Sequence, residues 1–140
     1  MYLPIIKKSS RYLNTSRRGA ELIKYASNAF LATKISYINE LANLCEKTDI
    51  DIEDTSIGMG LDKRIGSRFL RAGPAYGGSC FPKDTKAIIS TANEFKTNLS
   101  LIKSVIKSNE NRSNLLLNRV YEILNKKIKN KKITFLGVTF

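Results

Sequence analysis

The feature that most constrains the fold is a stretch from about Ala20 to Cys45 that contains neither glycine nor proline. Its apolar residues recur mostly at steps of three and four, the spacing of one face of an α-helix. They are Leu22, Ile23, Ala26, Phe30, Ile35, Ile38, Leu41, Ala42 and Cys45. The chain is therefore predicted to be mostly α-helical and built on one long helix.

Further helices are predicted on both sides of a glycine-rich centre. The long helix should stop near Thr48, and Asp51 is a candidate N-cap for a short helix that ends at the glycines of residues 58–60. Residues 61–84 are irregular, because four glycines mark turns there. A helix should resume after Pro82, since proline is favoured in a first turn. A last long helix should follow a break at residues 97–98.

These patterns divide the chain into three parts. Residues 1–17 form an irregular basic lead-in, and residues 18–130 form the helical domain. Residues 131–140, "KKITFLGVTF", are typical of the first strand of a nucleotide-binding α/β unit. Such a strand needs neighbours that this sequence does not supply. The chain is therefore predicted to be part of something larger.

Composition narrows the class of protein. A chain of 140 residues can form one domain with a core. No apolar run approaches the roughly 20 residues needed to cross a bilayer. The two cysteines lack a metal-type spacing, so we expect a reducing, cytoplasmic environment and no bound metal.

The net charge of +12 raises the possibility of nucleic-acid binding. The excess lies in residues 1–18, with five basic residues, and in residues 103–132, with nine basic and two acidic. Such segments can bind phosphate backbones. They are equally typical of a solvated helix face in a lysine-rich protein. No RNA- or DNA-binding signature accompanies them, so nucleic acid is not the expected partner.

The chain has no histidine, which excludes histidine-based catalysis and leaves two thiols to consider. Cys45 is in phase with the apolar face of the long helix and is expected in the core. Cys80 follows Gly-Gly-Ser and precedes Lys83 and Asp84 near a predicted helix start. A helix N-terminus and a nearby ammonium both favour the thiolate. Cys80 is thus a candidate nucleophile, or alternatively a small buried residue in a turn.

Lys24 and Asn28 are a second candidate pair. Four residues apart on a helix, they can converge on one small group, such as an oxyanion or hydroxyl. The alternative is that Lys24 faces water and pairs with Glu21. Arg64 and Arg71 lie among glycines where phosphate contact is plausible, although a solvated loop explains them as well.

Three stretches resemble the UDP-glucose/GDP-mannose dehydrogenase family: "AELIKYASNAFLATKISYINELANLCEK", "GMGLDKRIGSRFLRAGPAYGGSCFPKD" and "ITFLGVTF". The resemblance runs from Arg18 to Phe140, and Phe81 is typical of the UDP-glucose branch. It implies a central dimerisation domain whose long helix forms a homodimer. The family's glycine fingerprint for NAD is absent here, and only the first strand of its UDP-binding domain is present. Ala75 stands where many relatives carry glycine.

The resemblance also implies a chemistry and a set of site residues. The family oxidises the C6 alcohol of a nucleotide sugar, here UDP-glucose, to a carboxylate with two NAD. Cys80 would be the nucleophile that carries a thiohemiacetal and then a thioester. Lys24 and Asn28 would steady oxygen charge, and Asp84 would orient the reacting water. The residues implied to enclose the substrate are Phe69, Arg71, Tyr76, Gly77 and Phe81. Arg64 would reach the UDP site of the neighbouring subunit. Lys83 would lie near the cofactor.

Two alternatives from other classes stay open. One is a dimerisation module without catalytic activity, which would form helical dimers that do not respond to UDP-glucose or NAD. The other is a basic nucleic-acid binder, whose binding would weaken with salt. The enzyme hypothesis instead predicts that the 140-residue chain alone forms no NADH from UDP-glucose.

Overall fold

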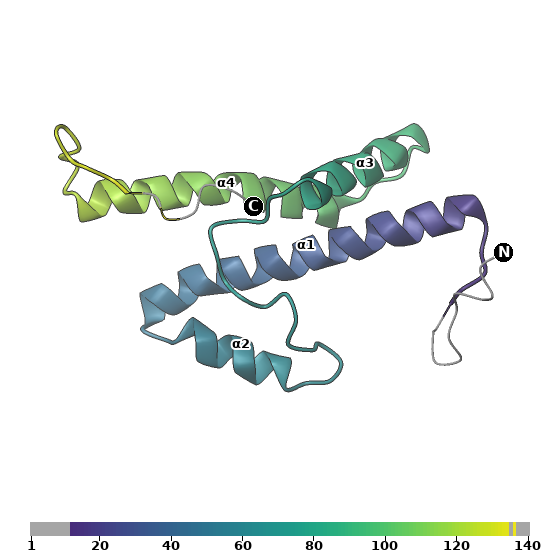
Figure 1. Ribbon diagram of the computed structural model, residues 1–140, viewed down its shortest axis with the longest axis horizontal. Helices are drawn as coiled ribbons and strands as arrows, with labels where there is room; N and C mark the ends of the chain where they lie inside the picture. Colours follow the sequence, from purple (N-terminus) through teal and green to yellow (C-terminus); the bar gives the residue numbers. More distant parts are fainter. Residues whose placement is uncertain (1–11, 135, 137–140) are drawn as a thin grey trace.

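The computed structural model describes residues 12–134 and residue 136. Its helices are α1 (Arg17–Thr48), α2 (Ile52–Gly60), α3 (Cys80–Glu94) and α4 (Ser100–Ile123). Helix α1 contacts each of the other three, whereas α2 contacts α1 alone. In Figure 1, α3 and α4 lie along one side of α1 and α2 lies on the other. The prediction of a mostly helical domain built on one long helix is confirmed.

Helix α1 begins three residues before the predicted apolar pattern and ends at Thr48, where the sequence predicts its stop. Ser16 caps its N-terminus by accepting a hydrogen bond from the backbone N–H of Gly19 at 3.0 Å. Asp49, in the left-handed conformation, ends the helix and donates its N–H to the carbonyl of Cys45. Between these caps nothing in the sequence breaks the helix.

The two shorter helices have different starts. Asp51 caps α2 as predicted, because its side chain accepts from the N–H of Glu53 at 2.7 Å. Helix α3 begins at Cys80, two residues before Pro82. The prediction that it starts after Pro82 was therefore wrong. The first N–H groups of a helix have no partner within it, so proline is accommodated anywhere in the first turn.

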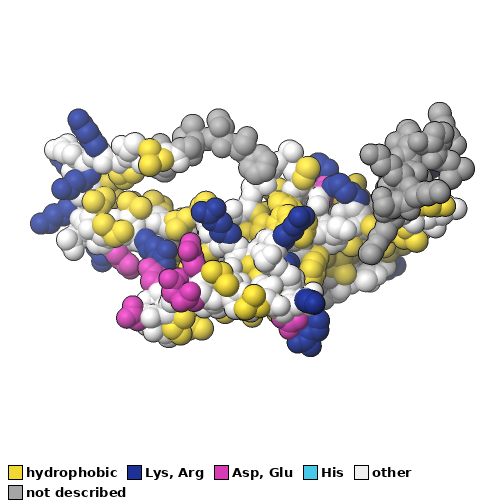
Figure 2. Space-filling view, turned by 60° about the horizontal axis from the view of Figure 1, so that its bottom comes forward, with side chains coloured by type: hydrophobic (Ala, Val, Ile, Leu, Met, Phe, Trp, Pro, Cys, Tyr) yellow, Lys and Arg dark blue, Asp and Glu magenta, His cyan; other side chains and the backbone are white. Residues whose placement is uncertain are grey.

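The core of the described chain is small. Ala32, Tyr76 and Val105 form a buried cluster against which Ile35 and Phe81 pack. Ile38 and Leu70 are the largest hydrophobic side chains to be fully buried. Many other large hydrophobic side chains stay exposed, and Figure 2 shows them across the middle of the molecule. Apolar surface of this extent is typical of a protein that binds a partner or further domains.

The two ends of the chain are described only in part. Residues 12–16 enter α1 without regular structure, while residues 1–11 of the predicted lead-in lie outside the described residues. The same holds for residue 135 and residues 137–140 of the predicted strand. Ile133, Thr134 and Leu136, which the structure does describe, are not in a strand.

Candidate active site

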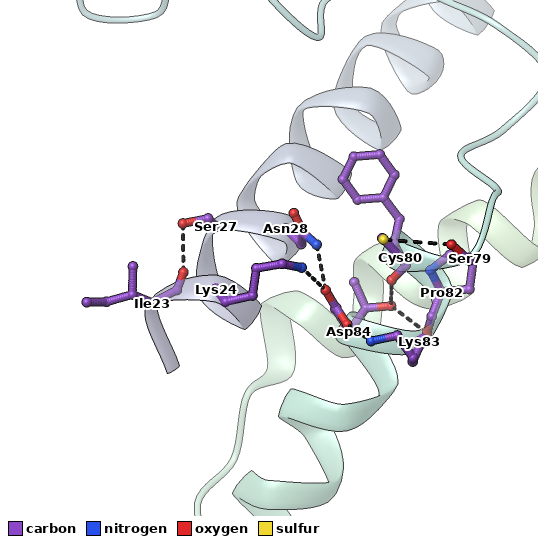
Figure 3. A network of polar contacts seen from close by, with 11 residues as sticks. Ile23, Lys24, Ser27, Asn28, Ser79, Cys80, Pro82, Lys83 and Asp84 are labelled. Atoms are coloured by element: carbon purple, nitrogen blue, oxygen red, sulfur yellow. Dashed lines mark hydrogen bonds and ion pairs between the residues drawn. The ribbon is translucent and has the colours of Figure 1, made fainter. Parts of the chain in front are cut away.

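Three side chains converge on Asp84, whose own side chain has no exposed surface. Its Oδ2 accepts hydrogen bonds from Nζ of Lys24 and Nδ2 of Asn28, each at 2.6 Å. Its Oδ1 accepts from Nζ of Lys83, also at 2.6 Å. Figure 3 shows Lys24 and Asn28 reaching this carboxylate from α1. Lys24 and Asn28 thus converge on the carboxylate of Asp84, and Lys24 pairs with Asp84 rather than with Glu21.

The hydrogen bonds hold the pKa of Asp84 far below its usual value of 3.8. The bond from Lys24 contributes most, that from Lys83 comes next, and burial acts in the opposite direction. Asp84 in turn raises the pKa of Lys83 above 10.5, chiefly through their hydrogen bond. Asp84 is therefore ionised at neutral pH, and its group of two ammonium ions and one carboxylate keeps one excess positive charge. Such a charge can stabilise a nearby oxyanion or thiolate.

The two cysteines differ in exposure, and the alternative that Cys80 is a small buried residue in a turn is wrong. Cys45 is 7% exposed and lies 3.8 Å from Oγ1 of Thr55, whereas Cys80 is exposed. Cys80 is the first residue of α3, and its sulfur lies 3.7 Å from Oγ of Ser79 (Figure 3). Asp84 is the fourth residue after Cys80, so both lie on one face of the helix. The accessible thiol thus lies at a helix N-terminus, one turn from the Asp84 group.

Three of the aromatic residues assigned to the substrate pack together beside Cys80. The ring of Phe81 lies edge-on to Phe69, with centroids 6.2 Å apart, and to Tyr76, at 6.0 Å. Tyr76 is 7% exposed, and burial raises the pKa of its phenol. Phe69 has a φ of 65°, a strained value for a residue with a side chain. This cluster joins the glycine-rich loop to the start of α3.

Among the described residues, none of the other assigned side chains is hydrogen-bonded to Asp84. Arg64 forms a hydrogen-bonded ion pair with Asp62, and its side chain is 89% exposed. Arg71 lines a groove with Glu53 and other residues of α2. A Cβ built on Gly77 would meet nothing within 4 Å, so the space beside this residue is open.

Sequence reasoning missed the residues that hold the loop between α2 and α3. Asn39 of α1 accepts from the N–H of Gly73 at 2.8 Å, and Asn109 of α4 accepts from the N–H of Tyr76 at 2.8 Å. Arg112 donates to the carbonyl of Gly73 at 3.1 Å, and its burial lowers its pKa. A signal existed, because Asn109 and Arg112 follow Val105 at helical spacing on a face that periodicity predicts to be buried.

Neither a membrane-crossing helix nor a metal-binding group is found among the described residues. None of the described helices is long and apolar enough to cross a membrane. Within the same part of the chain, no group of acidic or cysteine side chains is arranged to hold a metal ion.

Residues 18–111 match the central domain of the UDP-glucose/GDP-mannose dehydrogenase family. The chain belongs to this family. It is 48% identical over all 140 residues to the UDP-glucose 6-dehydrogenase of Rhizobium meliloti, covering 32% of that protein. It is 54% identical over 126 residues, 90% of the chain, to UDP-glucose 6-dehydrogenase YwqF of Bacillus subtilis, covering 28% of it.

A solved structure resembles the fold as well. The UDP-glucose dehydrogenase from Pyrobaculum islandicum superposes with a TM-score of 0.76 and 40% sequence identity. The match covers 79% of this chain and 26% of that one. The chain thus spans about a third of the length of the curated relatives that it matches.

Proposed function

We propose that this chain is the segment of an NAD-dependent UDP-glucose 6-dehydrogenase that carries the catalytic thiol. The observation that supports this most is the exposed Cys80 at the N-terminus of α3, one turn from Asp84. Asp84 there holds Lys24, Asn28 and Lys83 within 2.6 Å. The family and the names of the relatives supply the substrate, UDP-glucose, and the product, UDP-glucuronate.

Cys80 would act after the C6 alcohol has lost a hydride and a proton to become an aldehyde. Its thiolate attacks the aldehyde carbon, a C–S bond forms, and the oxygen takes up a proton to give a thiohemiacetal. Loss of a second hydride and of the hydroxyl proton gives a thioester. Water then adds to the thioester carbon, the C–S bond breaks, and the thiolate leaves with release of the carboxylate and two protons.

The side chains around Asp84 would stabilise the charges that these steps create. Oxygen becomes negative during attack on the aldehyde and during hydrolysis, and the ammonium of Lys24 and the amide of Asn28 can stabilise it. Both oxygens of Asp84 already accept hydrogen bonds. We therefore assign Asp84 the role of holding these donors and of orienting the reacting water through them.

The loop before α3 would enclose the substrate. Open space beside Gly77 allows a sugar to approach near Cys80, and the rings of Phe69, Tyr76 and Phe81 would form one wall. Arg71 would contribute to the same enclosure.

Two NAD molecules, bound one after the other, would each accept one hydride. The sequence has no glycine fingerprint for a dinucleotide, so this chain would contribute to the cofactor site only through Lys83, whose ammonium also bonds Asp84. Other parts of the protein would hold the cofactor. A reducing compartment such as the cytoplasm would keep the required thiol of Cys80 free.

The long helix supports the proposal of a homodimer. Ile23, Phe30, Tyr37 and Leu44 recur every seven residues along α1 and are 47%, 66%, 51% and 57% exposed. A seven-residue repeat forms one apolar face that a second helix can cover. The exposed Arg64 would then reach the neighbouring subunit's UDP site.

The test uses the intact protein that contains this chain, purified from its source cells and assayed for UDP-glucuronate formation. Cys80→Ser should abolish acid formation, because an oxygen ester replaces the thioester and turns over poorly. Cys45→Ala is the matched control and should remain active. Near-normal acid formation in Cys80→Ser would disprove the nucleophile. An intact wild-type protein that dimerises without any turnover would instead support the dimerisation module.

A further inference from the structure

We propose that Asn109 is a positioning residue for Cys80. Its amide holds the backbone of the loop that enters α3 and so sets the place of the thiol. This inference rests on the function proposed above for Cys80.

Asn109 satisfies both backbone groups of one residue. Its Oδ1 accepts from the N–H of Tyr76 at 2.8 Å, and its Nδ2 donates to the carbonyl of Tyr76 at 3.0 Å. A carboxamide carries a donor and an acceptor on one planar group, so it can pair with a residue as a neighbouring strand would. An aspartate can repeat only the first bond, and an alanine neither.

The loop of residues 67–79 depends on hydrogen bonds from side chains because its backbone groups do not bond to one another. Within the described chain, residues 67–79 form no hydrogen bond between backbone groups. Side chains of the helices take that place at three points: Ser56 at Leu70, Asn39 and Arg112 at Gly73, and Asn109 at Tyr76. Buried backbone groups that are left unpaired are costly. The loop conformation is therefore set by side chains of α1, α2 and α4.

Asn109 makes the last of these backbone contacts before the thiol. Only Gly77, Gly78 and Ser79 lie between Tyr76 and Cys80, and Gly78 has a φ of 73°, which glycine adopts without strain. The chain reaches at most roughly 3.6 Å per residue. Freeing Tyr76 would therefore move the point from which Cys80 enters α3.

The groove around Asn109 could in principle bind a ligand. It lies between α1 and α4, has a volume of about 200 Å³, and is lined by Asn39, Asn109 and Arg112 among others. These three side chains already bond the loop backbone. These three polar groups of the groove are thus engaged in holding the loop.

The experiment compares Asn109→Ala and Asn109→Asp with Asn114→Ala, an exposed asparagine of the same helix, in the intact protein. Rapid mixing with UDP-glucose and NAD measures the first hydride transfer, which does not use the thiol, separately from steady-state acid formation. For Asn109→Ala we expect the first transfer to stay within twofold of wild type and acid formation to fall at least tenfold. Asn109→Asp should be intermediate, and Asn114→Ala should match wild type.

Two outcomes would overturn the inference. One is wild-type acid formation in Asn109→Ala. The other is a fall of both steps in proportion to the folded fraction measured by circular dichroism, which would indicate a purely structural role. If Asn109→Ala does not fold, the same two measurements on Asn109→Asp test the inference, and either of these two outcomes in that variant would overturn it. Normal acid formation in Cys80→Ser is a different result, because it would disprove the proposed function itself.

Discussion

Replacing Arg112 by methionine tests whether buried side chains hold the loop between α2 and α3 in place. Arg112 is 7% exposed. It donates to the carbonyl of Gly73 at 3.1 Å, to the carbonyl of Asn39 at 3.0 Å and to Oδ1 of Asn43 at 2.5 Å. Methionine is unbranched and flexible and can fill most of the space, but it donates no hydrogen bond.

The expected loss follows from the three acceptors left behind. Each buried acceptor without a partner costs about 1–3 kcal/mol. Asn43 and Arg112 line a groove that water can enter, so the cost of each unpaired acceptor is taken as about 1 kcal/mol. The three acceptors together then cost about 3 kcal/mol. Removing a buried charge can itself stabilise a protein, chiefly when the groups that pair with the charge are replaced by apolar ones as well. In Arg112→Met the three acceptors remain polar, so no such offset is expected. Against a typical stability of about 5–15 kcal/mol this loss is large.

Urea unfolding followed by circular dichroism measures this loss in the 140-residue chain. The midpoint should fall with an unchanged m value, and the melting temperature should fall by roughly 10 °C. The matched control is Arg119→Met, two turns further along α4. Arg119 is 37% exposed and pairs with Glu46, which is 57% exposed, so about 0–1 kcal/mol is expected. Equal losses in the two variants, or a loss below about 1 kcal/mol for Arg112→Met, would refute the reasoning.

Three further predictions concern the site and the dimer. Because the pKa of Asp84 is lowered on folding, stability should fall as the pH drops below about 4, and Asp84→Asn should show a shallower fall in urea unfolding; equal slopes would contradict this. Iodoacetamide should modify the exposed Cys80 at least tenfold faster than Cys45, as mapped by peptide mass, and equal labelling would argue against an accessible thiol. Phe30→Lys should convert the dimer to a monomer in sedimentation velocity, and a wild-type monomer would contradict the proposed interface.

Helix positions were largely predictable because they depend on local spacing. The apolar period of residues 20–45 and the cap at Asp51 match α1 and α2 closely. The start of α3 was misplaced by three residues, since proline in a first turn does not show which position of that turn it occupies. The burial of Cys45 was also predicted, because it follows an apolar period, whereas the sequence left open whether Cys80 is exposed.

Residues within a few positions of one another were sufficient to predict the helices and the shared face of Lys24 and Asn28, because these features depend on local spacing. Only the tertiary structure decided that Lys24 and Asn28 bond Asp84, which lies 60 and 56 residues away. The same is true of Asn109 and Arg112, which bond backbone groups 33 and 39 residues earlier. Local spacing carries no information on such contacts, since the packing of α3 and α4 on α1 brings the partners together.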